Sequence, residues 1–176
     1  MMKKFFMAAL IALGIGTASS NAQVPAQLTL GYGGYTQMDA SDMHDGWHKV
    51  NNAWGALTAG VNFRVAPKLW IGPSYTFSST STKGEHSSSL AYHAIMLNAR
   101  YDYWQRRAVK VYAHVGIGAE ITHLMPHDGD SYNKSYCAFQ IVPVGVEYSL
   151  NRNVGIFGEL GYGAQGLIQA GVHFNF

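Results

Sequence analysis

Hydrophobic and polar residues alternate with a period of two along most of the chain. The clearest run covers residues 109–122, in which apolar residues from Val109 to Ile121 occupy every second position. Because successive side chains of a β-strand point to opposite faces, this pattern predicts a strand with one apolar face and one polar face. The run is longer than the usual strand of a soluble protein, about five or six residues. It is long enough for a tilted membrane-spanning strand, which needs about 9–11 residues.

Seven other segments alternate in a similar way. They cover residues 27–37, 54–65, 68–78, 90–103, 136–149, 153–163 and 166–176. Together with residues 109–122 they predict an all-β fold, an eight-stranded antiparallel up-and-down transmembrane β-barrel. Apart from a tight turn at residues 164–165, the predicted connections are long on one side of the barrel and short on the other. That layout is typical of bacterial outer-membrane barrels.

Two prolines interrupt the predicted strands. Pro73 and Pro143 lack a backbone donor, and a closed barrel has no free edge for them, so each should lie at a bulge or an unpaired position. Around Pro143 the alternation also changes phase. Extending the pattern of residues 144–148 backward would place Gln140 on the apolar face, whereas a bulge near Pro143 would exchange the faces of residues 137–141.

The alternation alone does not determine which face points outward, because a soluble lipocalin-like barrel has its apolar face inside and a membrane barrel has it outside. Tyr and Trp cluster near the predicted strand ends, where amphipathic rings would meet the bilayer interface. The polar faces carry a balanced set of charges: Arg64, Arg100, Lys110, Glu120, Glu147 and Glu159. We expect these six to form a lumen ion-pair network that leaves no open pore. Recovery of the protein from the soluble periplasm would favour the lipocalin-like barrel instead.

The end of the chain carries a motif. Residues 169–176 resemble the C-terminal signal of bacterial outer-membrane β-barrels through Gln169, Gly171, Phe174 and the terminal Phe176. Over residues 23–176 the chain is similar to the small eight-stranded OmpA/OmpX-like barrels, and residues 158–163 resemble the end of porin-like outer-membrane barrel domains. The resemblance implies a place in the bacterial outer membrane, among its lipids and lipopolysaccharide. It also implies delivery by periplasmic chaperones and insertion by the barrel-assembly machinery. It does not imply an enzymatic activity.

The N-terminus predicts a cleaved signal peptide over residues 1–22. Lys3 and Lys4 precede an apolar stretch, and Ser20 and Ala22 occupy the positions that a signal peptidase requires before Gln23. The barrel domain is therefore expected over residues 23–176. The net charge of the whole chain is only +2, and it comes from the two lysines of the predicted signal. So small a positive charge argues against a nucleic-acid partner.

The predicted topology separates the remaining charges. The end of the barrel with the short connections carries mainly basic residues, Lys68, Arg106, Arg107 and Arg152, against Asp102. We expect this basic side to lie near anionic phospholipid head groups, although ordinary solvation of turns explains the pattern equally well. The long connections are acidic.

Histidines are the main candidates for further chemistry. The long connection at residues 38–52 contains His44, Trp47 and His48, which we take as surface-loop contact candidates for an unknown extracellular partner. His44 and His48 lie four residues apart, as two metal ligands on a helix would, but the surrounding residues are not helical. We therefore expect no metal or cofactor. His114, on the polar face, is expected to be a hydrogen-bonding group of the lumen.

Two alternatives to a non-enzymatic barrel remain open at this point. Some eight-stranded barrels deacylate or acylate lipid A with Ser and His near the outer rim, and serines follow His86 directly. The segment at residues 78–89 is so rich in serine that such a neighbour is expected from composition alone. A narrow pore is the third possibility.

Overall fold

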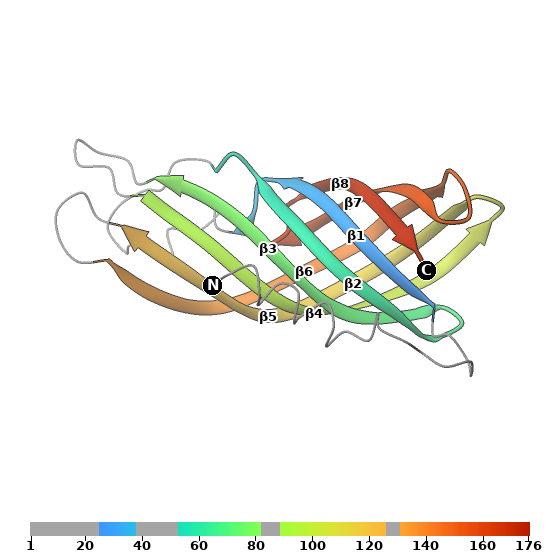
Figure 1. Cartoon of the computed structure of the whole chain (residues 1–176), viewed down its shortest axis with the longest axis horizontal. Helices are drawn as coiled ribbons and strands as arrows, with labels where there is room; N and C mark the ends of the chain where they lie inside the picture. The colour runs from blue at the N-terminus through green and yellow to red at the C-terminus, as the bar shows by residue number, and fades with distance from the viewer. Residues whose placement is uncertain (1–24, 38–52, 82–88, 126–130) are drawn as a thin grey trace.

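A computed structural model describes residues 25–37, 53–81, 89–125 and 131–176. These residues form a closed barrel in which eight antiparallel strands pair in sequence order and β1 pairs with β8 (Figure 1). The strands are β1 (Ala26–Gly34), β2 (Ala56–Ala66), β3 (Leu69–Ser81), β4 (Ser89–Arg106), β5 (Val109–Met125), β6 (Tyr132–Ser149), β7 (Val154–Gly163) and β8 (Ile168–Asn175). The predicted eight-stranded barrel is confirmed.

The barrel has two different ends. The short turns that join β2 to β3, β4 to β5 and β6 to β7 lie at one end with Pro25 and Phe176, and we call this the turn end. The opposite end, where residues 35–37, 53–55 and 164–167 lie, is called the loop end. In Figure 1 the turn end is on the right, where the C-terminus is marked.

The apolar face of the barrel points outward. In the middle of β5, Ile117 is 66% exposed, whereas Tyr112 on the opposite face of the same strand is 2% exposed. The same alternation runs along β4, where Ile95 and Leu97 are exposed and Met96 is buried. A continuous apolar exterior around a polar interior is the arrangement of a transmembrane barrel. Within the described part of the chain, no helix has the length and apolar character needed to cross a membrane.

Both prolines occupy the predicted kinds of position. The register of β6 against β7 shifts between Ile141 and Val144, and this bulge contains Pro143. It exchanges the faces as expected, because Gln140 is buried in the lumen and Ile141 is exposed. Pairing between β2 and β3 stops at Ser74 and resumes at Ile71, so Pro73 has no register partner on β2.

Several strand ends differ from the predictions. β4 and β6 each contain 18 residues, more than their apolar patterns predicted. Backbone pairing continues through polar residues such as His123 and Asn133, because the ladder needs no apolar side chains. By contrast, β1 ends at Gly34 rather than residue 37. Tyr35 has a positive φ of 52°, and after this bend Thr36 and Gln37 are buried.

Candidate functional site: the polar lumen

The lumen is lined by alternate residues of all eight strands, and its strongest interactions converge on Glu147. This β6 carboxylate is fully buried. Lys110 on β5 donates from Nζ to Oε1 at 2.8 Å, and Arg100 on β4 lies with Nη1 2.7 Å from Oε2. Gln27 on β1 donates to Oε2 at 3.2 Å, and His173 Nε2 on β8 lies 3.5 Å from Oε1. A buried carboxylate needs such partners, because leaving it unpaired would be very costly.

Arg100 connects this carboxylate to a second one. Its Nε donates to Asp102 Oδ1 at 2.8 Å, and its Nη1 donates to Gln27 Oε1 at 3.2 Å. The guanidinium Cζ lies 3.7 Å from the centre of the Tyr112 ring, a cation–π contact. Trp70 Nε1 donates to the other oxygen of Asp102 at 3.0 Å. The arginine is therefore held by groups from several strands, which fixes its position within the lumen.

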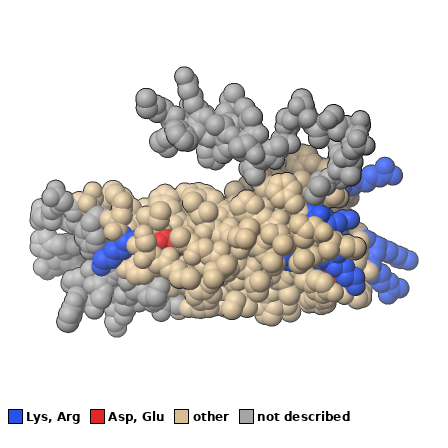
Figure 2. All heavy atoms as spheres, turned by 90° about the horizontal axis from the view of Figure 1, so that it is seen from below, with Lys and Arg blue, Asp and Glu red and all other residues tan. Residues whose placement is uncertain are grey.

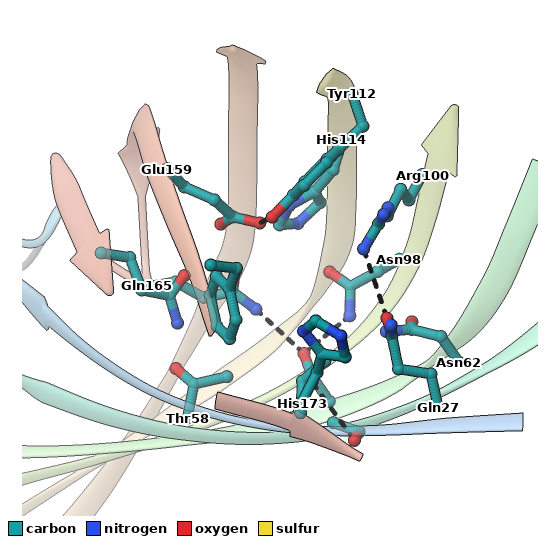
Figure 3. Close-up of a pocket in the computed structure, with 15 residues that line it drawn as sticks. Gln27, Thr58, Asn62, Asn98, Arg100, Tyr112, His114, Glu159, Gln165 and His173 are labelled. Atoms are coloured by element: carbon teal, nitrogen blue, oxygen red, sulfur yellow. Dashed lines mark hydrogen bonds and ion pairs between the residues drawn. The ribbon is translucent and has the colours of Figure 1, made fainter. Parts of the chain in front are cut away.

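A second group of residues surrounds Glu159 on β7. Tyr112 donates from its hydroxyl to Glu159 Oε1 at 2.7 Å, and His114 Nδ1 lies 3.3 Å from the same oxygen. Because Tyr112 also contacts Arg100, this group is continuous with the one around Glu147. Figure 3 shows Arg100, Tyr112, His114 and Glu159 converging inside the barrel. His114 therefore contacts a carboxylate of the lumen, as its position on the polar face predicted.

Two segments of the loop end fold into the barrel. Gln37 donates from Nε2 to Glu120 Oε2 at 3.0 Å, and Thr122 donates to the other oxygen of this carboxylate at 3.2 Å. Gln165 donates from Nε2 to Ser74 Oγ at 3.2 Å, and its backbone N–H donates to Gln140 Oε1 at 2.9 Å. These side chains and the turn that carries Gln165 occupy the loop-end half of the lumen.

The predicted lumen set is thus divided by the structure. Arg100, Lys110 and Glu147 meet directly, and Glu159 joins them through Tyr112. Glu120 lies apart, toward the loop end. The placement of Arg64 in the network is wrong: its side chain is exposed at the turn end, with Cζ 4.8 Å from the centre of the Trp70 ring. Arg64 lies at the start of a register shift near the end of β2, where the lumen opens to solvent.

Sequence reasoning also missed members of the network. Asp102 lies within the predicted strand at residues 90–103 but was grouped with the charges at the short-connection end, whereas its side chain keeps the inward direction of Arg100 and is buried. The spacing of two residues between them was the available signal. The roles of Gln27 and His173 had no such signal, because a polar residue at an inward position is common in any barrel of this kind.

The residues of the C-terminal motif lie on β8 and just beyond it. Gln169 is buried in the lumen, and Phe176 is exposed at the turn end. A Cβ atom at Gly171 would overlap the carbonyl oxygen of Leu30, so only glycine fits there. The surface-loop candidates His44, Trp47 and His48 lie outside the described residues, as does the predicted signal peptide.

A small cavity separates the network from the loop-end residues. It has a volume of about 40 Å³, which is room for a few water molecules and too little for a substrate. Arg100 Nη2, Asn98 Oδ1 and Glu159 Oε2 are buried without a hydrogen-bond partner within the protein, and all three residues line this cavity (Figure 3). Among the described residues, no three His, Cys, Asp or Glu side chains are grouped as a metal site would require.

Comparisons with known proteins agree with this architecture. A family model described as the outer membrane protein beta-barrel domain matches residues 5–175. The solved structure of Neisserial surface protein A is 17% identical, with a TM-score of 0.57 over 87% of this chain and 96% of that one. Ail, the attachment invasion locus protein of Yersinia pestis, solved with the heparin analogue sucrose octasulfate, is 10% identical, with a TM-score of 0.50 over 88% of this chain and 96% of that one. No curated protein matches the sequence significantly.

Proposed function

The chain belongs to the outer membrane protein β-barrel domain family, and from this premise we propose that it is a non-enzymatic barrel with a closed lumen and contact surfaces at its loop end. The protein is a β-barrel of the bacterial outer membrane. Its turn end then faces the periplasm and its loop end faces the cell exterior, which is the usual orientation of barrels with short turns and longer loops.

The observation that carries this proposal is the occupation of the lumen from both directions. The Glu147 network crosses the turn-end half, where Arg100 on β4 meets Glu147 on β6. Gln37 and Gln165 fill the loop-end half. Eight strands enclose a space that side chains can fill completely, so this barrel is suited to rigidity rather than to conduction. Rigid barrels hold loops in defined positions, and long loops on such scaffolds commonly bind partners.

The outer surface near the loop end supports a contact with the outer leaflet. Aromatic rings form a continuous row there, from Tyr32 through Trp54 and Phe77 to His93, with ring centres 5.3–6.5 Å apart. The Tyr75 hydroxyl lies 2.7 Å from His93 Nδ1 at the end of the row. Rings with an apolar body and a polar edge favour the membrane interface. We assign this row to the level of the lipopolysaccharide head groups.

The remaining partners follow from the same proposal. We propose that β8 and Phe176 are read by the barrel-assembly machinery, with Gln169, Gly171 and Phe174 as the other signal positions, after delivery by periplasmic chaperones. His44, Trp47 and His48 remain the candidates for contact with an extracellular partner.

Lipid A analysis tests the non-enzymatic assignment. Lipid A is extracted from cells with and without the protein and compared by mass spectrometry, with the expression level checked in membrane fractions. We expect identical acylation patterns. An acyl chain that is gained or lost only when the protein is present would replace the proposal with a lipid A-modifying enzyme.

A further inference from the structure

The turn end of the barrel opens into a basic vestibule. Its volume is about 580 Å³, within the range of roughly 300–1,000 Å³ that is usual for ligand pockets. Four cationic side chains line it: Arg64, Arg107, Lys110 and Arg152. Every other side chain of its lining is uncharged, including the buried Trp70 and the exposed Phe176. The vestibule is therefore a concave site of one sign of charge.

The cations of the vestibule differ in how they are used. Lys110 forms an ion pair with Glu147, and Arg64 lies over the Trp70 ring. Arg107 and Arg152 are exposed, and neither has an ion-pair partner in the part of the chain that the structure describes. Positive side-chain charge therefore exceeds negative side-chain charge at this mouth. A concave surface of one sign concentrates ions of the opposite sign.

The whole turn end shares this charge. Figure 2 shows Lys and Arg gathered at the right-hand end of the molecule, which is the turn end of Figure 1. The acidic residues of this half, Asp102 and Glu147, are buried and paired with Arg100 and Lys110. Their charges are therefore already balanced inside the lumen and do not neutralise the arginines at the rim.

The backbone around the vestibule is well connected. Ser149 donates to the carbonyl of Ala108 at 2.8 Å, which ties the end of β6 to the turn that carries Arg107. Asn175 donates to Asn153 at 2.7 Å, which ties β8 to the turn that carries Arg152. The backbone positions that carry Arg107 and Arg152 are thus held by the barrel, so a ligand would need to order only their side chains.

We propose that this vestibule binds a soluble, multivalent oxyanion on the periplasmic side. Guanidinium groups bind phosphate and carboxylate oxygens through paired hydrogen bonds, and several cations around one opening favour a ligand with several negative groups. A soluble ligand fits better than a lipid, because the vestibule is lined from inside the barrel by Trp70 and Lys110, whereas lipids surround its outer face. The periplasmic location rests on the proposed orientation, but the binding itself does not.

Inorganic tripolyphosphate is a suitable probe. The folded protein in zwitterionic detergent is titrated by isothermal calorimetry at low ionic strength. We expect saturable binding by the wild type and at least tenfold weaker binding by the double variant Arg107→Gln/Arg152→Gln. The matched control is Lys68→Gln/Arg106→Gln, which removes the same charge from the same end but from side chains that do not line the vestibule. Its affinity should stay within twofold of the wild type.

Three results would overturn the proposal. The first is the absence of saturable binding by the wild type, and the second is an equal loss of affinity in both double variants. The third is tripolyphosphate binding that is at least tenfold weaker in nanodiscs containing phosphatidylglycerol than in zwitterionic detergent. The last result would assign the vestibule to lipid head groups. All four substituted residues are exposed, and electrophoresis with and without boiling verifies that each variant is folded. Failure of binding would leave the lipid A result, and with it the proposed function, unaffected.

Discussion

Arg100 Nη1 and Glu147 Oε2 lie 2.7 Å apart although their strands, β4 and β6, are separated in the barrel by β5. The ion pair therefore spans strands that share no backbone ladder. Side chains on both sides of it extend the connection, Gln27 from β1 and Lys110 from β5. Ion pairs therefore connect strands across the lumen that backbone hydrogen bonds do not connect.

Loss of the Glu147 carboxylate should destabilise the barrel strongly. Glu147→Gln leaves the buried Arg100 and the partly buried Lys110 without their main counter-charge, which should lower the free energy of unfolding by about 3–5 kcal/mol. The measurement is urea unfolding in lipid vesicles, followed by tryptophan fluorescence. Lys68→Gln, in an exposed turn, serves as the control and should stay within about 0.5 kcal/mol of the wild type. A similar small change for Glu147→Gln would contradict the cross-linking role.

Arg64 and Arg100 should respond very differently to the same substitution. Arg64→Gln removes only an exposed cation–π contact, with an expected cost of about 0.5–1 kcal/mol. Arg100→Gln breaks buried pairs with Glu147 and Asp102 and should cost about 3–5 kcal/mol. The two variants are compared by the same urea titration. Equal costs would mean that Arg64 belongs to the network after all.

The outward face should show the depth dependence of a bilayer. Ile117 lies in the middle of β5 and is exposed, so Ile117→Arg should cost about 2–4 kcal/mol in vesicles. Val65 is exposed close to the turn end, and Val65→Arg should cost about 0–1 kcal/mol. Folding in vesicles of defined lipid gives both values. Similar costs at the two depths would argue against a membrane-spanning belt.

A glycine on β6 makes room for the Tyr112 ring. Gly145 pairs with Tyr112 in the β5–β6 ladder, and a Cβ atom at Gly145 would overlap the tyrosine ring. Gly145→Ala should therefore cost about 1–3 kcal/mol through overpacking. A Cβ atom at Gly34 would meet no heavy atom within 4 Å, which makes Gly34→Ala the control. If the two alanine variants unfold at the same urea concentration, Tyr112 does not need this space.

The sequence predicted the barrel well because the two-residue period applies to every strand and a shift of one residue reverses both faces. Even the bulge at Pro143 was predictable, since proline and the change of phase coincide. Individual contacts were less predictable. Arg64 and Arg100 both occupy polar-face positions, and only the three-dimensional position of the open end separates an exposed cation from a buried one.

The ends of the strands were the weakest predictions for a physical reason. Backbone pairing extends beyond the apolar belt, so β4 continues to Arg106, past the end of its predicted segment at residue 103, and Asp102 near that end is buried in the lumen. In the opposite direction, the bend at Tyr35 ends β1 early and turns Gln37 into the lumen. Neither event changes the period of two, and so neither is visible in the pattern.

The closed lumen is tested most directly by electrical recording. The folded protein, verified by its heat-dependent electrophoretic mobility, is inserted into planar lipid bilayers and single-channel currents are recorded in molar salt. The Glu147 network together with Gln37 and Gln165 predicts insertion without stable channels. Large, stable unitary currents from the wild-type protein would contradict a closed lumen and would favour a pore.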